Sequence, residues 1–227
     1  MTPYSVSFVN RFSRMVGRPI FRVLFHLLSD LKLFGREHVP IQGAYIIAVN
    51  HVSLFEPPLI LTFWPTPPEA VGAIEVWNRP GQGLLARLYG GIPVHRGEFD
   101  RQLLDTMISV LQSGRPMLLA PEGGRSHQPG IRRAHPGVAY IADKTGAPVI
   151  PVGVVGTSDD LLDRVIHLKR PHLEIRIGKP FNLPAVVGKG AERRQSLQAN
   201  ADQIMFAIAA LMPPEYRGVY QAPNEAR

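Results

Sequence analysis

An apolar run leads into a polar loop at Tyr45-Ile46-Ile47-Ala48-Val49-Asn50-His51-Val52-Ser53-Leu54-Phe55-Glu56. Its first five residues predict a buried strand, and two prolines close the loop that follows. A histidine titrates near neutral pH, so it can take a proton from a hydroxyl and return it to a leaving group. A nearby carboxylate can orient the ring and stabilise its protonated form. His51 and Glu56 are therefore a candidate base and orienter, although such a pair by itself is more often structural.

From Gly43 onward, short apolar runs alternate with amphipathic segments. The pattern predicts strands at residues 45–49, 70–74, 92–94, 117–120, 149–155 and 173–177. It predicts helices at residues 54–63, 82–89, 101–112, 138–144 and 191–211, the last one stopped by two prolines. This alternation predicts an α/β fold for residues 37–227, a single domain with a mixed, mostly parallel sheet flanked by helices. Functional residues are then expected in the loops at the strand ends.

The amino-acid composition excludes several kinds of catalytic and metal site. The 227 residues include no cysteine, which excludes disulfides, thiolate metal sites and thiol catalysis. No pair of histidines has the spacing of metal ligands, so we expect no metal. The net charge of +7 indicates an anionic partner: nucleic acid, a membrane surface or a phosphorylated substrate. Nucleic acid is not expected, because the sequence has none of the usual binding modules.

The first 36 residues are basic and apolar. They contain six basic residues against one acidic residue, together with many phenylalanines and leucines. Phe8, Phe12, Met15 and Val16 share one helical face, and arginines flank it. No apolar run reaches the roughly 18 residues of a membrane span, and no signal peptide is evident. Residues 1–36 therefore predict amphipathic helices that lie in the headgroup region of a membrane, with a helical hairpin packed on the protein's own core as the alternative.

Three further segments stand at the ends of predicted strands. They read Gly90-Gly91-Ile92-Pro93-Val94-His95-Arg96, Pro121-Glu122-Gly123-Gly124-Arg125-Ser126 and Val149-Ile150-Pro151-Val152. Two guanidinium groups can clamp one phosphate, and glycines let backbone amides approach it. Arg96, Arg125 and Gly123 are thus candidates for an anion site, and Glu122 could accept a hydrogen bond from a substrate hydroxyl. Each arginine alone is more often a solvated surface residue.

Taken in order, the four segments resemble the motifs of the glycerolipid acyltransferase superfamily, and most of all those of the bacterial lysophosphatidic acid (1-acylglycerol-3-phosphate) acyltransferases. The resemblance covers residues 50–157. It implies transfer of an acyl group from a thioester, carried by coenzyme A or by acyl carrier protein, to the hydroxyl of a lysophospholipid. It also implies no bound cofactor, membrane docking through the N-terminal helices, and association with the cytoplasmic face of the membrane.

The resemblance also implies roles for individual residues. His51 would act as the base, Glu56 as its orienter, and Arg96, Glu122, Gly123 and Arg125 as the site for the acceptor's glycerol phosphate. Two positions depart from the usual pattern: Glu56 stands where the family has aspartate, and Gly124 where it has threonine. Serine catalysis is a weaker alternative, because no Gly-x-Ser-x-Gly elbow occurs. A non-catalytic lipid-binding module and a thioesterase or lipid hydrolase remain as rival functions.

Overall fold

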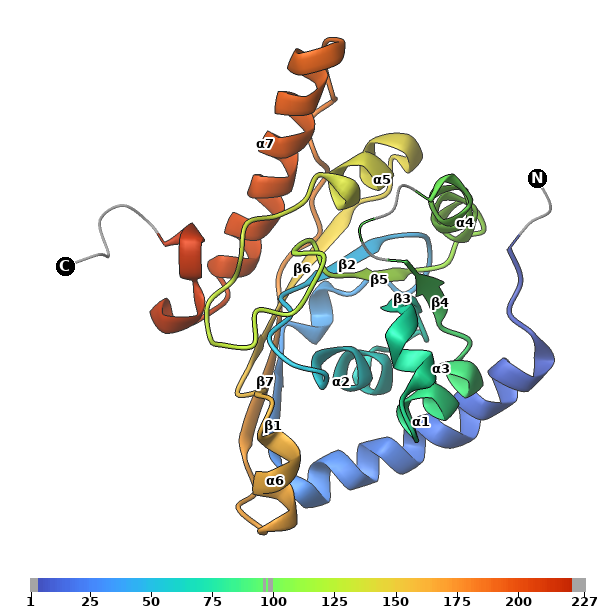
Figure 1. The fold of residues 1–227 in the computed structure, drawn as a ribbon, viewed down its shortest axis with the longest axis vertical. Coiled ribbons are helices and arrows are strands. Elements are labelled where there is room, and N and C mark those ends of the chain that lie inside the picture. Colours follow the sequence, from blue (N-terminus) through green and yellow to red (C-terminus); the bar gives the residue numbers. More distant parts are fainter. Residues whose placement is uncertain (1–3, 96, 98–99, 222–227) are drawn as a thin grey trace.

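The computed structural model describes residues 4–95, 97 and 100–221, and these form a sheet with helices on both faces (Figure 1). The strands are β1 (Asp30–Phe34), β2 (Ile46–Val49), β3 (Glu69–Ala73), β4 (Ile92–Val94), β5 (Met117–Leu119), β6 (Val149–Val155) and β7 (His172–Ile177). The α-helices are α1 (Phe8–Leu28), α2 (Glu56–Phe63), α3 (Gln82–Tyr89), α4 (Arg101–Gln112), α5 (Gly137–Thr145), α6 (Leu161–Ile166) and α7 (Gly190–Ala209).

The sheet places the loops that follow its central strands side by side. Among the described residues its order is β1-β7-β6-β2-β5-β3-β4, and every neighbouring pair is parallel except β6 and β7. Ile47 in β2 pairs with Leu118 in β5 on one side and with Ile150 in β6 on the other. Parallel strands end at the same edge of a sheet, so the loops after β2, β5 and β6 converge there.

The core lies on both faces of the sheet, which explains why β2 is a continuous apolar run. On one face, Ile46 and Ala48 pack in a buried cluster with side chains of α4, α5 and α7. On the other face, Ile47 and Val49 pack with α2. The helix α1 lies across the outside of α2 and α3 (Figure 1).

The predicted α/β class and mostly parallel sheet are confirmed. All six predicted strands and all five predicted helices of the domain are present, with ends shifted by two residues or fewer. Local signals set several of these ends: Asp100 caps α4 by accepting from the amide of Leu103 at 3.0 Å, and Gly90 ends α3 with a φ of 78°. The sequence did not predict strand β1 or helix α6.

The structure of the N-terminal segment differs from the pair of amphipathic helices predicted for residues 1–36. A single helix of 21 residues, α1, ends at Leu28, and the residues that follow it form the edge strand β1 beside β7. The last part of the segment predicted as helical therefore belongs to the sheet. No described helix is long and apolar enough to cross a membrane.

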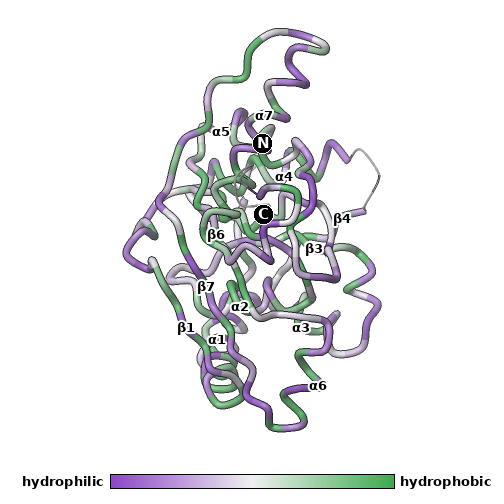
Figure 2. The backbone as a smooth tube through the Cα atoms, turned by 90° about the vertical axis from the view of Figure 1, so that its left-hand side faces the viewer, coloured by the Kyte–Doolittle hydropathy of each residue, from purple (hydrophilic) through white to green (hydrophobic). Residues whose placement is uncertain are grey.

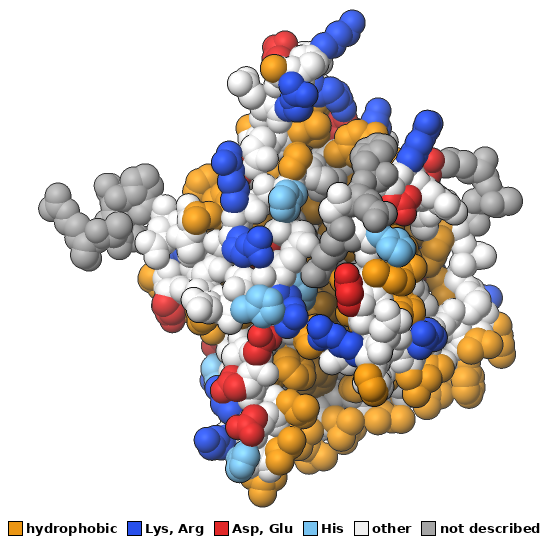
Figure 3. Space-filling model, viewed as in Figure 1, with side chains coloured by type: hydrophobic (Ala, Val, Ile, Leu, Met, Phe, Trp, Pro, Cys, Tyr) orange, Lys and Arg blue, Asp and Glu red, His pale blue; other side chains and the backbone are white. Residues whose placement is uncertain are grey.

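The two faces of α1 are unlike, and hydropathy alternates along its tube in Figure 2. Three arginines point inward. Arg14 forms two hydrogen bonds with buried Glu69, at 2.8 and 2.6 Å, while Arg18 and Arg22 donate to backbone carbonyls at the end of α2, Leu61 and Thr62. Most of the outward side chains are apolar and exposed: Phe8, Val9, Phe12, Met15, Val16, Ile20, Val23, Leu24 and Leu27. Arg11 is exposed as well. This outer face of α1 forms the orange lower border of the molecule in Figure 3.

Candidate active site

His51 and Glu56 meet at the end of β2. Nδ1 of His51 lies 3.0 Å from Oε2 of Glu56, the first residue of α2. The Glu56 side chain is fully buried, whereas 13% of the His51 side chain is exposed. A carboxylate at Nδ1 favours the imidazole tautomer with its proton on that nitrogen, which leaves Nε2 as the nitrogen that can accept a proton. The longer side chain of glutamate thus reaches the histidine from a retracted, buried position.

A set of donors fixes the Glu56 carboxylate. Its Oε1 accepts from the Ser53 hydroxyl at 3.0 Å and from the Thr157 hydroxyl at 2.5 Å. The backbone amide of Ser53 lies 3.0 Å from both carboxylate oxygens. Because Ser53 is buried and donates to Glu56 rather than facing His51, its arrangement does not suit a nucleophile. Thr157 comes from the loop after β6, so two strand ends build the support for Glu56.

Asn50 joins the same two strand ends through its side chain. Its amide group donates to the carbonyl of Val154 at 3.0 Å, and its carbonyl oxygen accepts from the amide of Val154 at 2.7 Å. Both atoms of the side-chain amide are therefore paired with β6. This fixes the backbone directly before His51, so the histidine leaves the sheet from a rigid point.

Glu122 lies beneath the site and is 1% exposed. Its Oε1 accepts from the backbone amide of His51 and its Oε2 from that of Arg132, both at 2.8 Å. Burial raises the pKa of the Glu122 carboxyl, while the two backbone donors oppose that effect. Each carboxylate oxygen thus holds a backbone amide in the structure. The predicted contact between Glu122 and a substrate hydroxyl stays a prediction.

The loop that follows Glu122 packs against the His51 loop. The amide of Ser126 donates to the carbonyl of His51 at 2.8 Å, and the amide of His127 to that of Val52 at 3.1 Å. Gly123 has a φ of 66°, and a Cβ there would approach within 2.9 Å of a carbon in the His135 ring. Glycine is therefore required at this turn.

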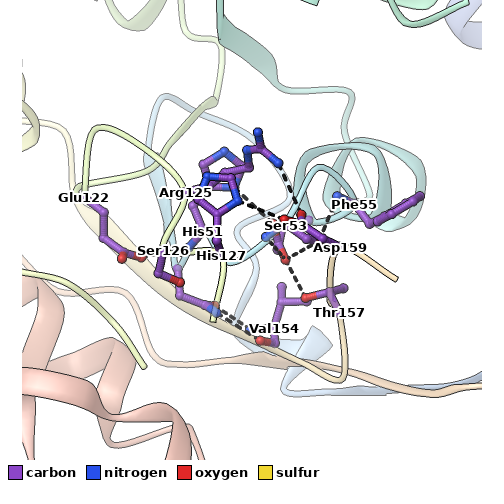
Figure 4. Close-up of polar contacts among 12 residues, drawn as sticks. His51, Ser53, Phe55, Glu122, Arg125, Ser126, His127, Val154, Thr157 and Asp159 are labelled. Atoms are coloured by element: carbon purple, nitrogen blue, oxygen red, sulfur yellow. Dashed lines mark hydrogen bonds and ion pairs between the residues drawn. The ribbon is translucent and has the colours of Figure 1, made fainter. Parts of the chain in front are cut away.

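Arg125, the predicted anion ligand, overlaps His51 in the view of Figure 4 and is paired with a carboxylate. Its Nη1 is 3.2 Å from Oδ1 of Asp159, whose Oδ2 is 2.8 Å from Nδ1 of His127. The second predicted arginine, Arg96, lies outside the described residues. The described residues contain no cluster of side chains suited to a metal. Sequence reasoning did not assign roles to Thr157 or Asp159; their only sequence signal is a position just after a predicted buried strand.

Comparisons with known proteins agree with this architecture. A family model described as Acyltransferase matches residues 30–155. A 1-acyl-sn-glycerol-3-phosphate acyltransferase from Chlamydomonas reinhardtii is 25% identical over 85% of this chain and 57% of its own length. A lyso-ornithine lipid O-acyltransferase from Pseudomonas aeruginosa is 29% identical over 71% of this chain and 67% of its own length.

A solved structure supports the fold. The 1-acyl-sn-glycerophosphate acyltransferase from Thermotoga maritima superimposes with a TM-score of 0.61 and 22% identity, covering 86% of this chain and 79% of that one. At 22% identity this match supports the fold alone. The chain spans 57% of the Chlamydomonas relative and the same share of a second 1-acyl-sn-glycerol-3-phosphate acyltransferase, from Borreliella burgdorferi.

Proposed function

The chain belongs to the acyltransferase family, and from that premise we propose that it transfers a fatty acyl group from an acyl thioester to the free hydroxyl of 1-acylglycerol 3-phosphate, which gives phosphatidic acid. The observation that carries the proposal is the 3.0 Å contact between Nδ1 of His51 and Oε2 of buried Glu56. This contact leaves Nε2 to act on a hydroxyl. The names of two relatives contribute the acceptor, 1-acylglycerol 3-phosphate.

The proposed reaction proceeds in one displacement without an acyl-enzyme. Nε2 of His51 takes the proton of the acceptor hydroxyl as that oxygen attacks the thioester carbonyl carbon. The carbon–sulfur bond then breaks, and the departing thiolate receives the proton from the imidazolium. Base catalysis of this kind contributes roughly 10² to 10⁴ in rate. Glu56 orients the ring and offsets its transient positive charge.

The acceptor phosphate is assigned to the loop after β5. Arg125 lies on the loop that is hydrogen-bonded to the His51 loop, so a phosphate at its guanidinium would place a glycerol hydroxyl close to the base. Arg96 and the backbone at Gly123 complete the proposed site. Glu122 supports it from below, because its carboxylate holds the amide of His51 at 2.8 Å.

We assign membrane docking to the outer face of α1. Arg14, Arg18 and Arg22 are occupied by protein partners, so the surface offered to a bilayer is mostly apolar, with Arg11 exposed on the same helix. Burying such a face in the interfacial region is favourable by roughly 25 cal/mol per Å². The protein would then bind the cytoplasmic face of the membrane without spanning it, and take its acyl donor from coenzyme A or acyl carrier protein.

An assay with the purified protein separates the candidate functions. Labelled acyl thioester is incubated with and without 1-acylglycerol 3-phosphate, and the labelled products are resolved. Product that requires the acceptor is expected from the proposed transferase. Free fatty acid without acceptor dependence would identify a hydrolase instead, and binding without turnover would identify a lipid-binding module. Running coenzyme A and carrier-protein thioesters in parallel identifies the donor.

A further inference from the structure

The Arg125 guanidinium is paired with a carboxylate of the protein itself. The carboxylate of Asp159 places one oxygen 3.2 Å from the Arg125 guanidinium and the other 2.8 Å from the ring of His127. The Arg125 side chain is 16% exposed and that of Asp159 is 47% exposed. A carboxylate and a phosphate are recognised by a guanidinium through the same donor geometry. Asp159 therefore occupies the kind of position that an acceptor phosphate would take.

Asp159 is also tied to the catalytic residues by the chain itself. It lies two residues after Thr157, whose hydroxyl is bonded to Glu56. The loop is held again at Gly156, whose amide donates to the hydroxyl of Tyr216 at 3.1 Å and whose carbonyl accepts from Arg164 at 3.0 Å. The loop is thus fixed two and three residues before Asp159, so the Asp159 carboxylate stays in the neighbourhood of Arg125 even when its direct contact is displaced.

We propose that Asp159 determines acceptor selectivity by competing with the acceptor's anionic group for Arg125. An acceptor headgroup that carries only negative charge has to displace the Asp159 carboxylate from Arg125 and is then repelled by it. A headgroup that carries an ammonium beside its anion can offer the ammonium to Asp159 and the anion to Arg125. Asp159 thus disfavours phosphomonoester lysolipids relative to zwitterionic lysolipids. This inference rests on the proposed function, because it assigns Arg125 to the acceptor.

The test compares two acceptors across three proteins. Values of kcat/KM are measured for 1-acylglycerol 3-phosphate and for lysophosphatidylethanolamine with the wild type, Asp159→Asn and Asp163→Asn. Asp163 is a matched control, because it is an exposed aspartate beside a histidine on the neighbouring helix α6, 3.4 Å from His167. Both substitutions remove one negative charge and leave the buried residues unchanged.

The expected result is a shift in the ratio of the two kcat/KM values. For Asp159→Asn the ratio should rise about fivefold in favour of 1-acylglycerol 3-phosphate, mainly through a lower KM for that acceptor. A fivefold change is at the upper end of what a partly exposed ion pair contributes. Asp163→Asn should leave the ratio unchanged. An unchanged ratio for Asp159→Asn would overturn the proposal. A higher KM for the phosphomonoester would do so too, because it would show that Asp159 only holds Arg125 in place.

Binding measurements separate this inference from the proposed function. Glycerol 3-phosphate and glycerophosphoethanolamine, the soluble headgroups, are titrated into the wild type and Asp159→Asn and followed by NMR. Tighter binding of glycerol 3-phosphate to Asp159→Asn supports the selectivity role even if no acyl transfer is found. Equal binding to both proteins contradicts that role even if the wild type is an active transferase.

Discussion

Thr157 donates its hydroxyl to Oε1 of Glu56 at 2.5 Å, and both residues are buried. The contact joins residues 101 positions apart in the chain and makes the end of β6 part of the support for the proposed base, His51, at the end of β2. Because Oε1 is held by Thr157 and Ser53, Oε2 is the oxygen directed at His51.

Replacing Thr157 should therefore reduce turnover without removing a group that touches substrate. Thr157→Val keeps the shape of the side chain but removes the donor, and we expect kcat to fall about tenfold with little change in KM, which corresponds to the loss of a hydrogen bond to a charged group. Thr157→Ser restores the hydroxyl and should restore most of the activity. Equal losses in kcat for the two variants would assign Thr157 a packing role only.

Replacing Glu122 tests whether it positions the backbone of His51. Glu122→Gln keeps the size, but its amide nitrogen would face a backbone N–H donor at either His51 or Arg132. We expect a loss of about 1–3 kcal/mol in stability, seen as a lower Tm, together with a lower kcat. If Glu122 instead only bound the acceptor, the substitution would raise KM and leave Tm unchanged.

The buried carboxylate of Glu69, which is bonded to Arg14 of α1 and to Arg115, predicts that the stability of the folded protein falls at acidic pH. Burial raises the pKa of the Glu69 carboxyl, but hydrogen bonds and charge from Arg14 and Arg115 outweigh that effect and lower it overall. A lowered pKa means that Glu69 stabilises the folded state at neutral pH, above its unfolded pKa, and that this stability is lost as the pH falls through the folded pKa.

Glu69→Ala should destabilise the protein by about 3–5 kcal/mol at pH 7, because it leaves the buried Arg14 without its partner. The difference in Tm between wild type and variant should shrink when the pH is lowered well below the ordinary pKa of a glutamate carboxyl, about 4.3, since protonated Glu69 no longer neutralises Arg14. Thermal unfolding followed by circular dichroism at both pH values measures this. A Tm difference that stays constant with pH would contradict the ionic role of Glu69.

The inward arginines of α1 also determine how membrane binding should respond to salt. The double substitution Phe12→Ser and Met15→Ser removes two apolar side chains that are 54% and 65% exposed. It should weaken binding to phospholipid vesicles at least about tenfold in a sedimentation assay, because each Å² of lost apolar contact costs about 25 cal/mol. Binding of the wild type should fall only modestly as the salt concentration rises, because Arg11 is exposed on α1 whereas Arg14, Arg18 and Arg22 are paired within the protein. Val219→Ser, on an exposed apolar residue of the short 3-10 helix Gly218–Tyr220 that packs against α7, is the control and should bind like the wild type.

A strong fall in vesicle binding between low and high salt would contradict this account of α1. It would instead agree with the electrostatic attraction that the composition of residues 1–36 suggests. Equal binding by Val219→Ser and the doubly substituted protein would show that the outer face of α1 is not the docking surface.

The sequence predicted the layers of the fold well, because buried strands and amphipathic helices produce local patterns that need no tertiary information. It also predicted the His51–Glu56 contact, which spans five residues. The helical face of α1 that turns inward was not predictable in the same way, since the partners of Arg14 and Arg22 come from residues 55 and 40 positions away. The strand β1 was missed because its apolar residues continue the pattern of the helix before it.

The other contacts that the sequence did not predict join residues that are far apart in the chain. Glu122 lies in a glycine-rich loop, which suggests exposure, yet the segment around Arg132 covers it and the His51 amide takes its other oxygen. The pairing of Arg125 with Asp159 joins loops 34 residues apart. No local pattern marks Asp159 or Thr157 as part of a site, because both depend on the parallel pairing of β2 with β6.

The most direct test of the proposed mechanism is the acceptor-dependent acyl transfer rate of His51→Ala. The side chain of His51 is the only part that the substitution removes, and its backbone contacts with Glu122 and Ser126 can persist. We predict a kcat at least about 10² below that of the wild type, the lower bound for loss of a general base, with an unchanged Tm. A variant that keeps the full acceptor-dependent rate would show that His51 is not the base.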